Sequence, residues 1–330
     1  MMVPRQVLVV GTGLAGTRVA ETLQAEGYDG RVVVVGDEAD PPYERPALSK
    51  EFLSGARTAE ELLLRAPAFW EAHGIELELG RRVVAVDADA RSALVTGGRE
   101  LAWDALVLAT GARPRRLPFG ALPGVHALRT LADARALREA LTPGSRLVVG
   151  GGGFVGAEVA STARLLGVEV TMLEARSVPF ERTLGHEVGR LLAERYRAHG
   201  VDLRVPAGAA GFRAGAGGQL RSVVLGDGGE VACDSVLVGI GVELAAELVA
   251  ERPGRADLRV RRRDRRPRPL GERRGRGGRS RPVAARPAGA AACAGVLLVG
   301  TVRPAAAARR PRGGSGRARR RRGVVRRALP

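Results

Sequence analysis

The chain has 330 residues, enough for two or three domains, and 45% of them are apolar, enough to build hydrophobic cores. Its formal charge of +18 is concentrated at one end, because residues 1–250 carry 27 Lys and Arg against 31 Asp and Glu, whereas residues 251–330 carry 26 against 4. The first 250 residues therefore have the mildly acidic composition of an ordinary enzyme, which argues against a basic nucleic-acid-binding body.

The first strand of the chain ends in a glycine motif. Residues 7–10 are a continuous apolar run, typical of a strand buried on both faces, and they lead into Gly11-Thr12-Gly13-Leu14-Ala15-Gly16 and then a helical pattern. In this spacing Gly11 makes the tight turn, Gly13 lets the backbone approach a pyrophosphate, and Gly16 lets the helix pack on the strand. The helix N-terminus then faces the phosphates, so the motif predicts a dinucleotide site.

The strand that follows this helix supplies a carboxylate. Residues 32–35 form a second apolar run, which ends at Gly36-Asp37-Glu38. An acid at this place accepts hydrogen bonds from the ribose hydroxyls of a bound dinucleotide. We predict that Asp37 has this role, with Glu38 as the alternative.

The same arrangement occurs a second time. Residues 147–149 lead into a glycine cluster in which Gly151, Gly153 and Gly156 have the required spacing, a helix follows, and the next strand ends at Glu174. One such glycine motif is weak evidence, but two copies, each between a strand and a helix and each followed by an acid, indicate a repeated nucleotide-binding unit.

The two halves also match at their far ends. Residues 106–111, ending at Thr110 and Gly111, and residues 236–241, with Gly239 and Gly241, are strands that stop at glycine. The repeat therefore organises residues 5–241, and it predicts an α/β fold of two Rossmann-like, three-layer dinucleotide-binding domains. Further short strands are expected in small antiparallel crossover sheets, at residues 76–79, 83–86, 93–96, 203–205 and 221–225.

Three segments carry a resemblance to a known family. The stretch Pro42-Tyr43-Glu44-Arg45-Pro46-Ala47-Leu48-Ser49-Lys50 is similar to the segment beside the flavin in NADH:ferredoxin reductases of bacterial oxygenase systems, the putidaredoxin and rhodocoxin reductase type. Thr110-Gly111-Ala112-Arg113-Pro114 looks like the second FAD motif of that family, and Gly156-Ala157-Glu158 resembles its NADH motif. These enzymes belong to the pyridine nucleotide-disulfide oxidoreductase superfamily but have no redox disulfide.

The resemblance implies roles for individual residues. Arg45 and Lys50 are expected to contact FAD, with Lys50 near the reactive edge of the flavin and able to pair with Glu158, which is expected near the nicotinamide ring. Hydride transfer also favours a cation at that edge, which stabilises the reduced flavin. Lys50 is the only lysine of the chain. Thr110, Gly111 and Arg113 are expected to contact FAD as parts of the second motif.

The predicted function is transfer of electrons from NADH through FAD to a [2Fe-2S] ferredoxin, which feeds a haem-thiolate or Rieske oxygenase. Glu174 favours NADH because a carboxylate repels a 2′-phosphate, although Arg176, two residues on, leaves NADPH as an alternative. A rubredoxin reductase or an NADH oxidase-like diaphorase is the alternative within enzymes. A non-catalytic flavoprotein or a basic nucleic-acid-binding protein is the alternative from another class.

The remaining residues suggest no other chemistry. Cys233 and Cys293 stand far apart without a CxxC motif, which favours a reducing cytoplasm and excludes a thiol relay beside the flavin. The four histidines lack metal-ligand spacing, so no metal is predicted. No stretch reaches the roughly 20 apolar residues of a membrane span, and a strand so near the N-terminus leaves no room for a secretion signal. A cytoplasmic protein without membrane or specific nucleic-acid partners is expected.

The last 80 residues are of a different kind. Arg, Ala, Gly and Pro make up 60 of residues 251–330, and their codons begin with two G or C bases, as an off-frame reading of GC-rich DNA would give. We predict a frameshift between about residues 245 and 260, a disordered tail, and loss of the segment that completes the FAD domain. The expected domains are an incomplete FAD-binding domain at 1–115, an NAD-binding domain at 116–241, and a tail at 242–330.

Overall fold

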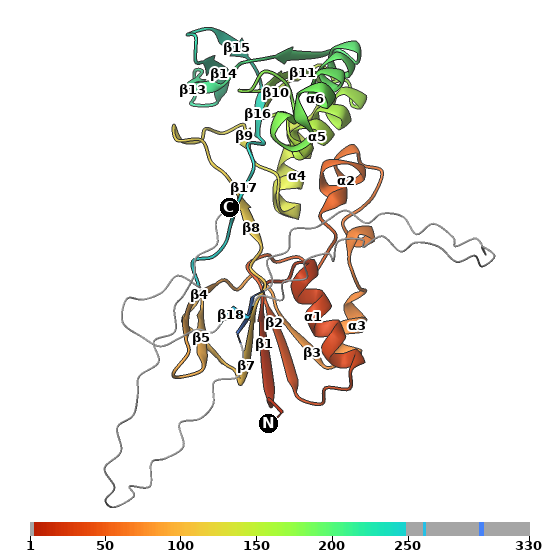
Figure 1. The fold of residues 1–330 in the computed structure, drawn as a ribbon, viewed down its shortest axis with the longest axis vertical. Coiled ribbons are helices and arrows are strands. Elements are labelled where there is room, and N and C mark those ends of the chain that lie inside the picture. The colour runs from red at the N-terminus through yellow and green to blue at the C-terminus, as the bar shows by residue number, and fades with distance from the viewer. Residues whose placement is uncertain (1–2, 249–259, 262–296, 300–330) are drawn as a thin grey trace, which may run out of the picture.

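The computed structural model describes residues 3–248, 260–261 and 297–299. They form two units, each built around a parallel sheet, which lie end to end in the long direction of the molecule (Figure 1). We call residues 6–108 the first unit and residues 125–238 the second unit. None of the helices in these described ranges is long and apolar enough to cross a membrane.

The first unit contains a six-stranded sheet in the order β18-β19-β7-β1-β2-β3. Its strands are β1 Gln6–Val10, β2 Arg31–Val35, β3 Ile75–Glu78, β7 Ala105–Leu108, β18 Val260–Arg261 and β19 Leu297–Val299. The central strand β1 is parallel to both neighbours, so that Val9 stands beside Val34 of β2 and Val107 of β7. A parallel strand covered on both faces needs a continuous apolar sequence, as residues 7–10 have.

Alternate side chains of these strands build two cores. Val9 and Val34 face helices α1 (Leu14–Ala25) and α3 (Pro67–Ala72), where Ala20 and Trp70 are buried. Leu8 and Val33 face the other way, onto an antiparallel sheet of β4 Val83–Asp87, β5 Ser92–Val95 and β6 Glu100–Ala102. The first unit therefore has three layers, in the order helices, parallel sheet, small antiparallel sheet.

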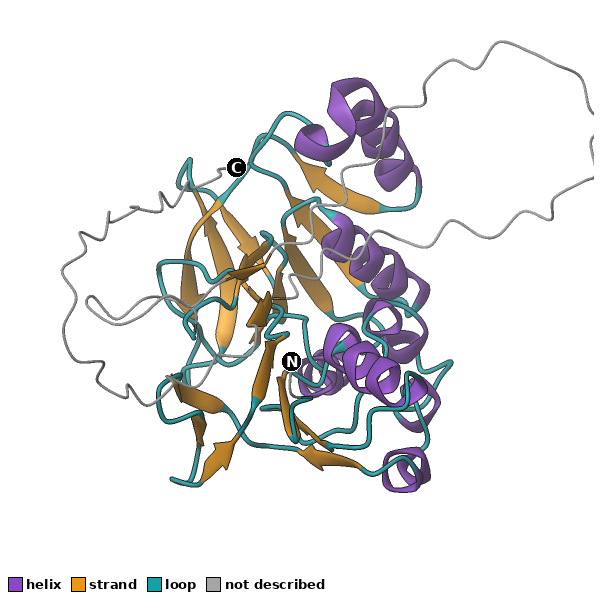
Figure 2. Ribbon diagram, turned by 60° about the horizontal axis from the view of Figure 1, so that its bottom comes forward, coloured by secondary structure: helices purple, strands orange, loops and turns teal. Residues whose placement is uncertain are grey.

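The second unit repeats this plan. Its sheet has the order β12-β11-β10-β16-β9, formed by β9 Val125–His126, β10 Arg146–Gly150, β11 Glu169–Leu173, β12 Val201–Arg204 and β16 Ser235–Val238. One face carries α4 Leu131–Ala140, α5 Phe154–Leu165 and α6 Glu181–Ala198, and the other carries β13 Ala209–Ala214, β14 Leu220–Leu225 and β15 Glu230–Ala232. Figure 2 shows the helices of both units gathered along one side of the strands.

The fold class predicted from the sequence is confirmed, with one correction in detail. Residues 76–79 and 203–205 were expected in the antiparallel crossover sheets, and this prediction is wrong. β3 pairs with β2 and β12 pairs with β11, both in parallel, at the edges of the main sheets. The edge strand of a parallel sheet is half-exposed, so its sequence alternates between apolar and polar residues as that of an antiparallel strand does.

The two units are joined by more than the covalent chain. Between β2 and α3 the backbone makes η1 Pro46–Ser49, α2 Glu51–Ser54 and η2 Glu60–Leu62, and this excursion reaches the second unit beside α4 and α5 (Figure 1). Leu53 of α2 has no exposed surface and belongs to the core of the second unit. After the second unit, β17 Val242–Leu244 returns along β8 Ala112–Pro114 as an antiparallel pair.

Part of the predicted tail can be described. β19 pairs antiparallel with β7 and with β18, which extends the first sheet by two short strands. The rest of residues 249–330, and with it the predictions of a frameshift and of a disordered tail, lies outside the described residues.

Candidate functional site

The two glycine turns have the same geometry. Gly11 has φ +118° and Gly151 has φ +104°, values that L side chains rarely adopt. A Cβ at Gly11 would collide with the carbonyl oxygen of Ala109 at the end of β7, and one at Gly151 would collide with that of Gly239 at the end of β16. The chain just after β7 therefore requires a glycine at position 11, and the chain just after β16 requires one at position 151.

The other two glycines of each motif differ from the first in what surrounds them. Gly13 is the N-cap of α1 and Gly153 is the N-cap of α5, and a Cβ at either position would meet nothing within 4 Å. Gly16 and Gly156 instead press against the carbonyl of the first glycine in their own turns. Open space thus lies in front of both helix N-termini, where a backbone N–H can approach a phosphate.

The acid after the second strand differs between the units. Gly11 donates its N–H to Val35 and Gly151 donates to Leu173, so the residues next along the chain, Gly36 and Glu174, occupy equivalent positions. Glu174 lies over the second glycine turn, where its carboxylate accepts the N–H of Gly152 at 2.8 Å and that of Arg176 at 2.9 Å. At Gly36 the corresponding space is filled by the side chain of Thr12.

Asp37 and Glu38 point to different partners. Asp37 forms an ion pair with Arg82 at 3.0 Å, and both side chains are half-exposed. Glu38 turns inward and pairs with Arg45 at 2.5 Å, while Tyr43 donates its hydroxyl to the same carboxylate. The structure therefore places the alternative, Glu38, rather than Asp37, in a cluster with other predicted site residues.

This cluster contains an arginine that sequence reasoning missed. Arg45 donates to the carbonyl of Arg129 at 2.5 Å, and the Arg129 guanidinium lies 3.5 Å from the position that a Cβ on Gly111 would take. Burial, followed by the repulsion of Arg45, lowers the pKa of Arg129, whereas burial raises the pKa of Tyr43 above its ordinary range. The charges of Arg45 and Arg129 lie near enough to repel one another, and both residues are partly buried, so together they offer positive charge to an anion.

The second predicted FAD motif lies at the return of the chain from the second unit. Thr110 donates its hydroxyl to the carbonyl of Ala245 at 2.5 Å, and Arg113 pairs with Glu247 at 2.7 Å. Gly239 donates its backbone N–H to the carbonyl of Gly150, and the carbonyl of Gly241, which is exposed, accepts from the N–H of Arg115.

Lys50 and Glu158 bring the two units together. The Lys50 ammonium lies 3.1 Å from one oxygen of Glu158, and Ser49 donates its hydroxyl to the other oxygen at 2.5 Å. Lys50 follows η1 of the first unit, whereas Glu158 lies on α5, one turn after the open N-cap at Gly153. The only lysine of the chain is thus held beside the predicted nicotinamide site by the helix that would bind the second dinucleotide.

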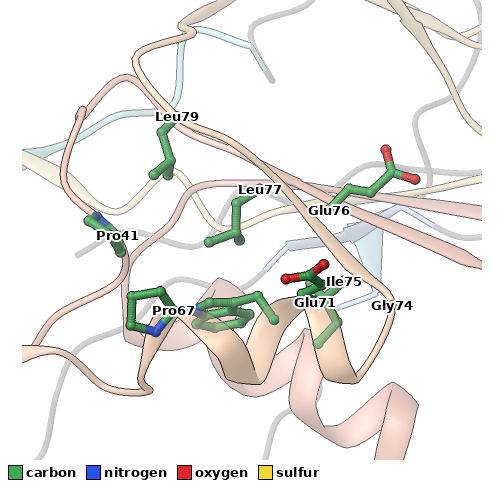
Figure 3. Close-up of a pocket in the computed structure, with 9 residues that line it drawn as sticks. Pro41, Pro67, Glu71, Gly74, Ile75, Glu76, Leu77 and Leu79 are labelled. Carbon is green, nitrogen blue, oxygen red and sulfur yellow. The ribbon is translucent and has the colours of Figure 1, made fainter.

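A metal site, a reactive thiol and a surface pocket were also sought among the described residues. Within residues 3–248 and the two short strands that follow, no group of His, Cys, Asp and Glu could hold a metal ion. Cys233 is buried in the core of the second unit, and burial raises the pKa of its thiol to about 11. A pocket of about 550 Å³ lies at the outer edge of β3, lined by Pro41, Pro67, Trp70 and Leu77 among others, and no predicted site residue lines it (Figure 3).

Comparisons with known proteins agree with this architecture. A family model described as pyridine nucleotide-disulphide oxidoreductase matches residues 5–265. The biphenyl dioxygenase system ferredoxin–NAD(+) reductase component of Paraburkholderia xenovorans (strain LB400) is 44% identical over 244 residues, which are 73% of this chain and 59% of that protein. Putidaredoxin reductase of Pseudomonas putida is 40% identical over 250 residues, 74% of this chain and 59% of that protein.

A solved structure gives the same result. The crystal structure of the covalent putidaredoxin reductase–putidaredoxin complex contains a chain that is similar to this one with a TM-score of 0.72 and 39% identity, covering 74% of this chain and 60% of that chain. The present chain therefore matches about three fifths of the length of these relatives.

Proposed function

The chain belongs to the pyridine nucleotide-disulphide oxidoreductase family, and from that premise we propose that it is an NADH-dependent flavoprotein reductase that passes electrons to a ferredoxin. The observation that carries the proposal is the ion pair between Lys50 and Glu158, which joins the two glycine-turn units at one point. The pair places a cation of the first unit against α5, the helix that follows the second glycine turn, and hydride transfer between two cofactors is favoured by a cation at the flavin edge.

The proposed domains follow the two sheets. The first unit, with residues 1–115, would bind FAD, and residues 116–241 would bind NADH, while the ribbon of β8 and β17 carries the chain between them. FAD fits the first unit, because the space before Gly13 is open and the Arg129 guanidinium offers positive charge beside Gly111, which follows β7. Thr110, Gly111 and Arg113 are proposed to contact FAD from the end of β7.

Individual residues would then act on the bound cofactors. When bound, FAD supplies the conversion of a two-electron hydride donor into single-electron transfers. Lys50 would hold a positive charge at the flavin edge, and Glu158 would keep the Lys50 ammonium there while it lines the nicotinamide site. Glu38, already paired with Arg45, is proposed for the ribose of FAD in preference to Asp37.

NADH is proposed as the electron donor because Glu174 lies directly over the second glycine turn. Its carboxylate can accept the ribose 2′-hydroxyl of NADH but would repel a 2′-phosphate. Arg176 offers only its backbone N–H to this carboxylate, and its side chain is exposed. The name of the biphenyl dioxygenase relative, a ferredoxin–NAD(+) reductase component, supports the same choice.

The proposed electron acceptor is a [2Fe-2S] ferredoxin that serves a haem-thiolate or Rieske oxygenase. The relatives named above are the reductase of a biphenyl dioxygenase system and putidaredoxin reductase, and the solved structure is a complex with putidaredoxin. The chain has no cysteine before Cys233, so no thiol in the first unit can relay electrons to a disulfide.

Stopped-flow spectroscopy of the FAD-loaded 330-residue chain tests the proposal. Mixing with NADH should bleach the flavin absorbance, and a purified [2Fe-2S] ferredoxin should then be reduced in the presence of the enzyme. Bleaching without ferredoxin reduction would favour an NADH oxidase-like diaphorase, and reduction of rubredoxin alone would favour a rubredoxin reductase. If the chain binds FAD but NADH does not reduce it, the proposed activity is wrong.

A further inference from the structure

One face of α5 holds the segment that carries Lys50. Glu158 and Thr162 are one turn apart on this helix and both bond to the same residue of the first unit. Ser49 donates its hydroxyl to Glu158 at 2.5 Å, and Thr162 donates its hydroxyl to the Ser49 carbonyl at 2.8 Å. The dipeptide Ser49-Lys50 is therefore bound to α5 through its backbone as well as through its side chains.

The two hydroxyl residues at this contact are buried, whereas the two charged residues are partly exposed. Ser49 and Thr162 are each only 5% exposed, whereas the side chains of Lys50 and Glu158 are 39% and 37% exposed. An ion pair as exposed as this contributes little net stability and is weakened by salt, so it cannot by itself hold a long lysine side chain in one place. A buried hydroxyl that donates to a carboxylate is a stronger and more directional constraint.

The segment on either side of Ser49 is also fixed. Leu48, which precedes it, is buried between the excursion and α4, and Leu53 of α2 is buried in the core of the second unit. Movement of Ser49 would require both contacts to break. Among residues 3–248, the two side-chain donors that reach the Glu158 carboxylate are Ser49 and Lys50, and the hydroxyl of Ser49 is the buried one.

We propose that Ser49 is a positioning residue, which fixes the carboxylate of Glu158 and through it the Lys50 ammonium, and that Thr162 keeps Ser49 in register with α5. The consequence for the reaction rests on the proposed function, because only there does Lys50 stand beside a flavin. The ordering of Lys50 itself does not depend on it and can be measured without cofactor.

The single lysine makes that measurement specific. In the full chain labelled with ¹³C-lysine, every labelled side-chain signal comes from Lys50. We expect the two protons on its Cε to have separate shifts and restricted motion in the wild type, and to become averaged and narrow in Ser49→Ala. Reaction of the Lys50 amine with a small acylating reagent, followed by peptide mapping, should become about two- to fivefold faster, as loss of an exposed ion pair implies.

The chain supplies a matched control. Ser222 is 3% exposed and donates its hydroxyl to Glu230 at 2.8 Å, and Glu230 in turn pairs with Arg213 in the sheet of β13, β14 and β15. Ser222→Ala thus removes a buried serine–glutamate bond next to an ion pair, but far from Lys50 in the fold. It should leave the Lys50 signals and acylation rate unchanged. Equal Lys50 signals in Ser49→Ala, Ser222→Ala and wild type would overturn the proposal.

Thr162 gives a second variant in case Ser49→Ala fails to fold. Thr162→Val keeps the shape and removes the donor, and it should loosen Lys50, whereas Thr162→Ser should recover the wild-type signals. In the FAD-loaded enzyme, Ser49→Ala and Thr162→Val should slow flavin reduction by about tenfold without raising the KM for NADH, as misplacement of a reacting group does. Failure of the wild type to reduce flavin would count against the proposed function, while unaltered Lys50 signals would count against this inference alone.

Discussion

Gly152 donates its backbone N–H to the carboxylate of Glu174 at 2.8 Å, so the acid that follows β11 is held across the glycine turn. Glu174→Ala should therefore lower kcat/KM for NADH by about tenfold or more, since one hydrogen bond to a charged group is lost. The kcat/KM for NADPH should fall less than that for NADH, or should rise, because the carboxylate would repel the 2′-phosphate. Steady-state kinetics with both cofactors measures the ratio, and Glu169→Ala, an exposed acid on the same strand, is the control. An unchanged ratio would show that Glu174 does not select the cofactor.

Two substitutions of Lys50 separate the effect of its charge from the effect of its shape. Lys50→Met should leave the FAD content close to that of the wild type and slow flavin reduction by NADH by about a hundredfold, the usual effect of removing one electrostatic stabiliser from an active site. Lys50→Arg keeps the charge and the pairing with Glu158 and should retain more of the rate. Single-turnover stopped-flow traces provide the comparison. If NADH reduces the flavin equally slowly in both variants, the exact position of the Lys50 ammonium matters and its charge alone does not.

The first two glycines of each turn should respond differently to alanine. At Gly13 a Cβ has free space and alanine is merely a poorer N-cap than glycine, so Gly13→Ala should lower the melting temperature by only about two degrees while FAD binding is lost. At Gly11 the positive φ and the collision with Ala109 should lower the melting temperature by several degrees. Calorimetry together with flavin content distinguishes the two. The matching substitution Gly153→Ala should raise the KM for NADH and leave bound FAD unaffected.

The burial of the Cys233 thiol should make the protein less stable in alkaline solution. Burial raises the pKa of its thiol from 9.0 to about 11, so the folded state keeps the proton that the unfolded chain loses above pH 9. The contribution to stability is fully present below pH 9 and disappears as the pH rises to about 11, which amounts to about 2 kcal/mol of unfolding free energy. Urea unfolding at pH 8, 9, 10 and 11 should show a smaller decline for Cys233→Ala than for the wild type. Parallel declines would mean that other groups, such as Tyr196, dominate.

Local patterns were enough to predict both glycine turns and most of the parallel strands. A strand covered on both faces and a turn before a helix each leave a signal within a dozen residues, as residues 7–16 show. The pairing of Lys50 with Glu158 was expected only through a family resemblance. The structure brings the two side chains to 3.1 Å, although 108 positions separate them in the chain.

The remainder of the site depends on contacts that no local pattern encodes. Arg129 joins Arg45 across 84 positions, and Thr162 bonds Ser49 across 113. A signal was available for Ser49, since it lies inside residues 42–50, which resemble the flavin segment of the family, but none marked Thr162, whose neighbours predict an ordinary helix. Sequence spacing alone does not decide between Asp37 and Glu38, because Asp37 pairs with Arg82 and Glu38 with Arg45, and spacing does not place either arginine.

The burial of Leu53 in the core of the second unit sets an order for synthesis of the protein. The core cluster that it joins includes Leu147, Val159 and Leu237, all of which leave the ribosome well after Leu53 itself. The early part of the nascent chain must therefore wait, with an apolar helix uncovered, until nearly all of the second unit has been made. A ribosome that stalls near residue 120 would release a fragment that has every strand of the first sheet up to β7 and yet cannot bury α2.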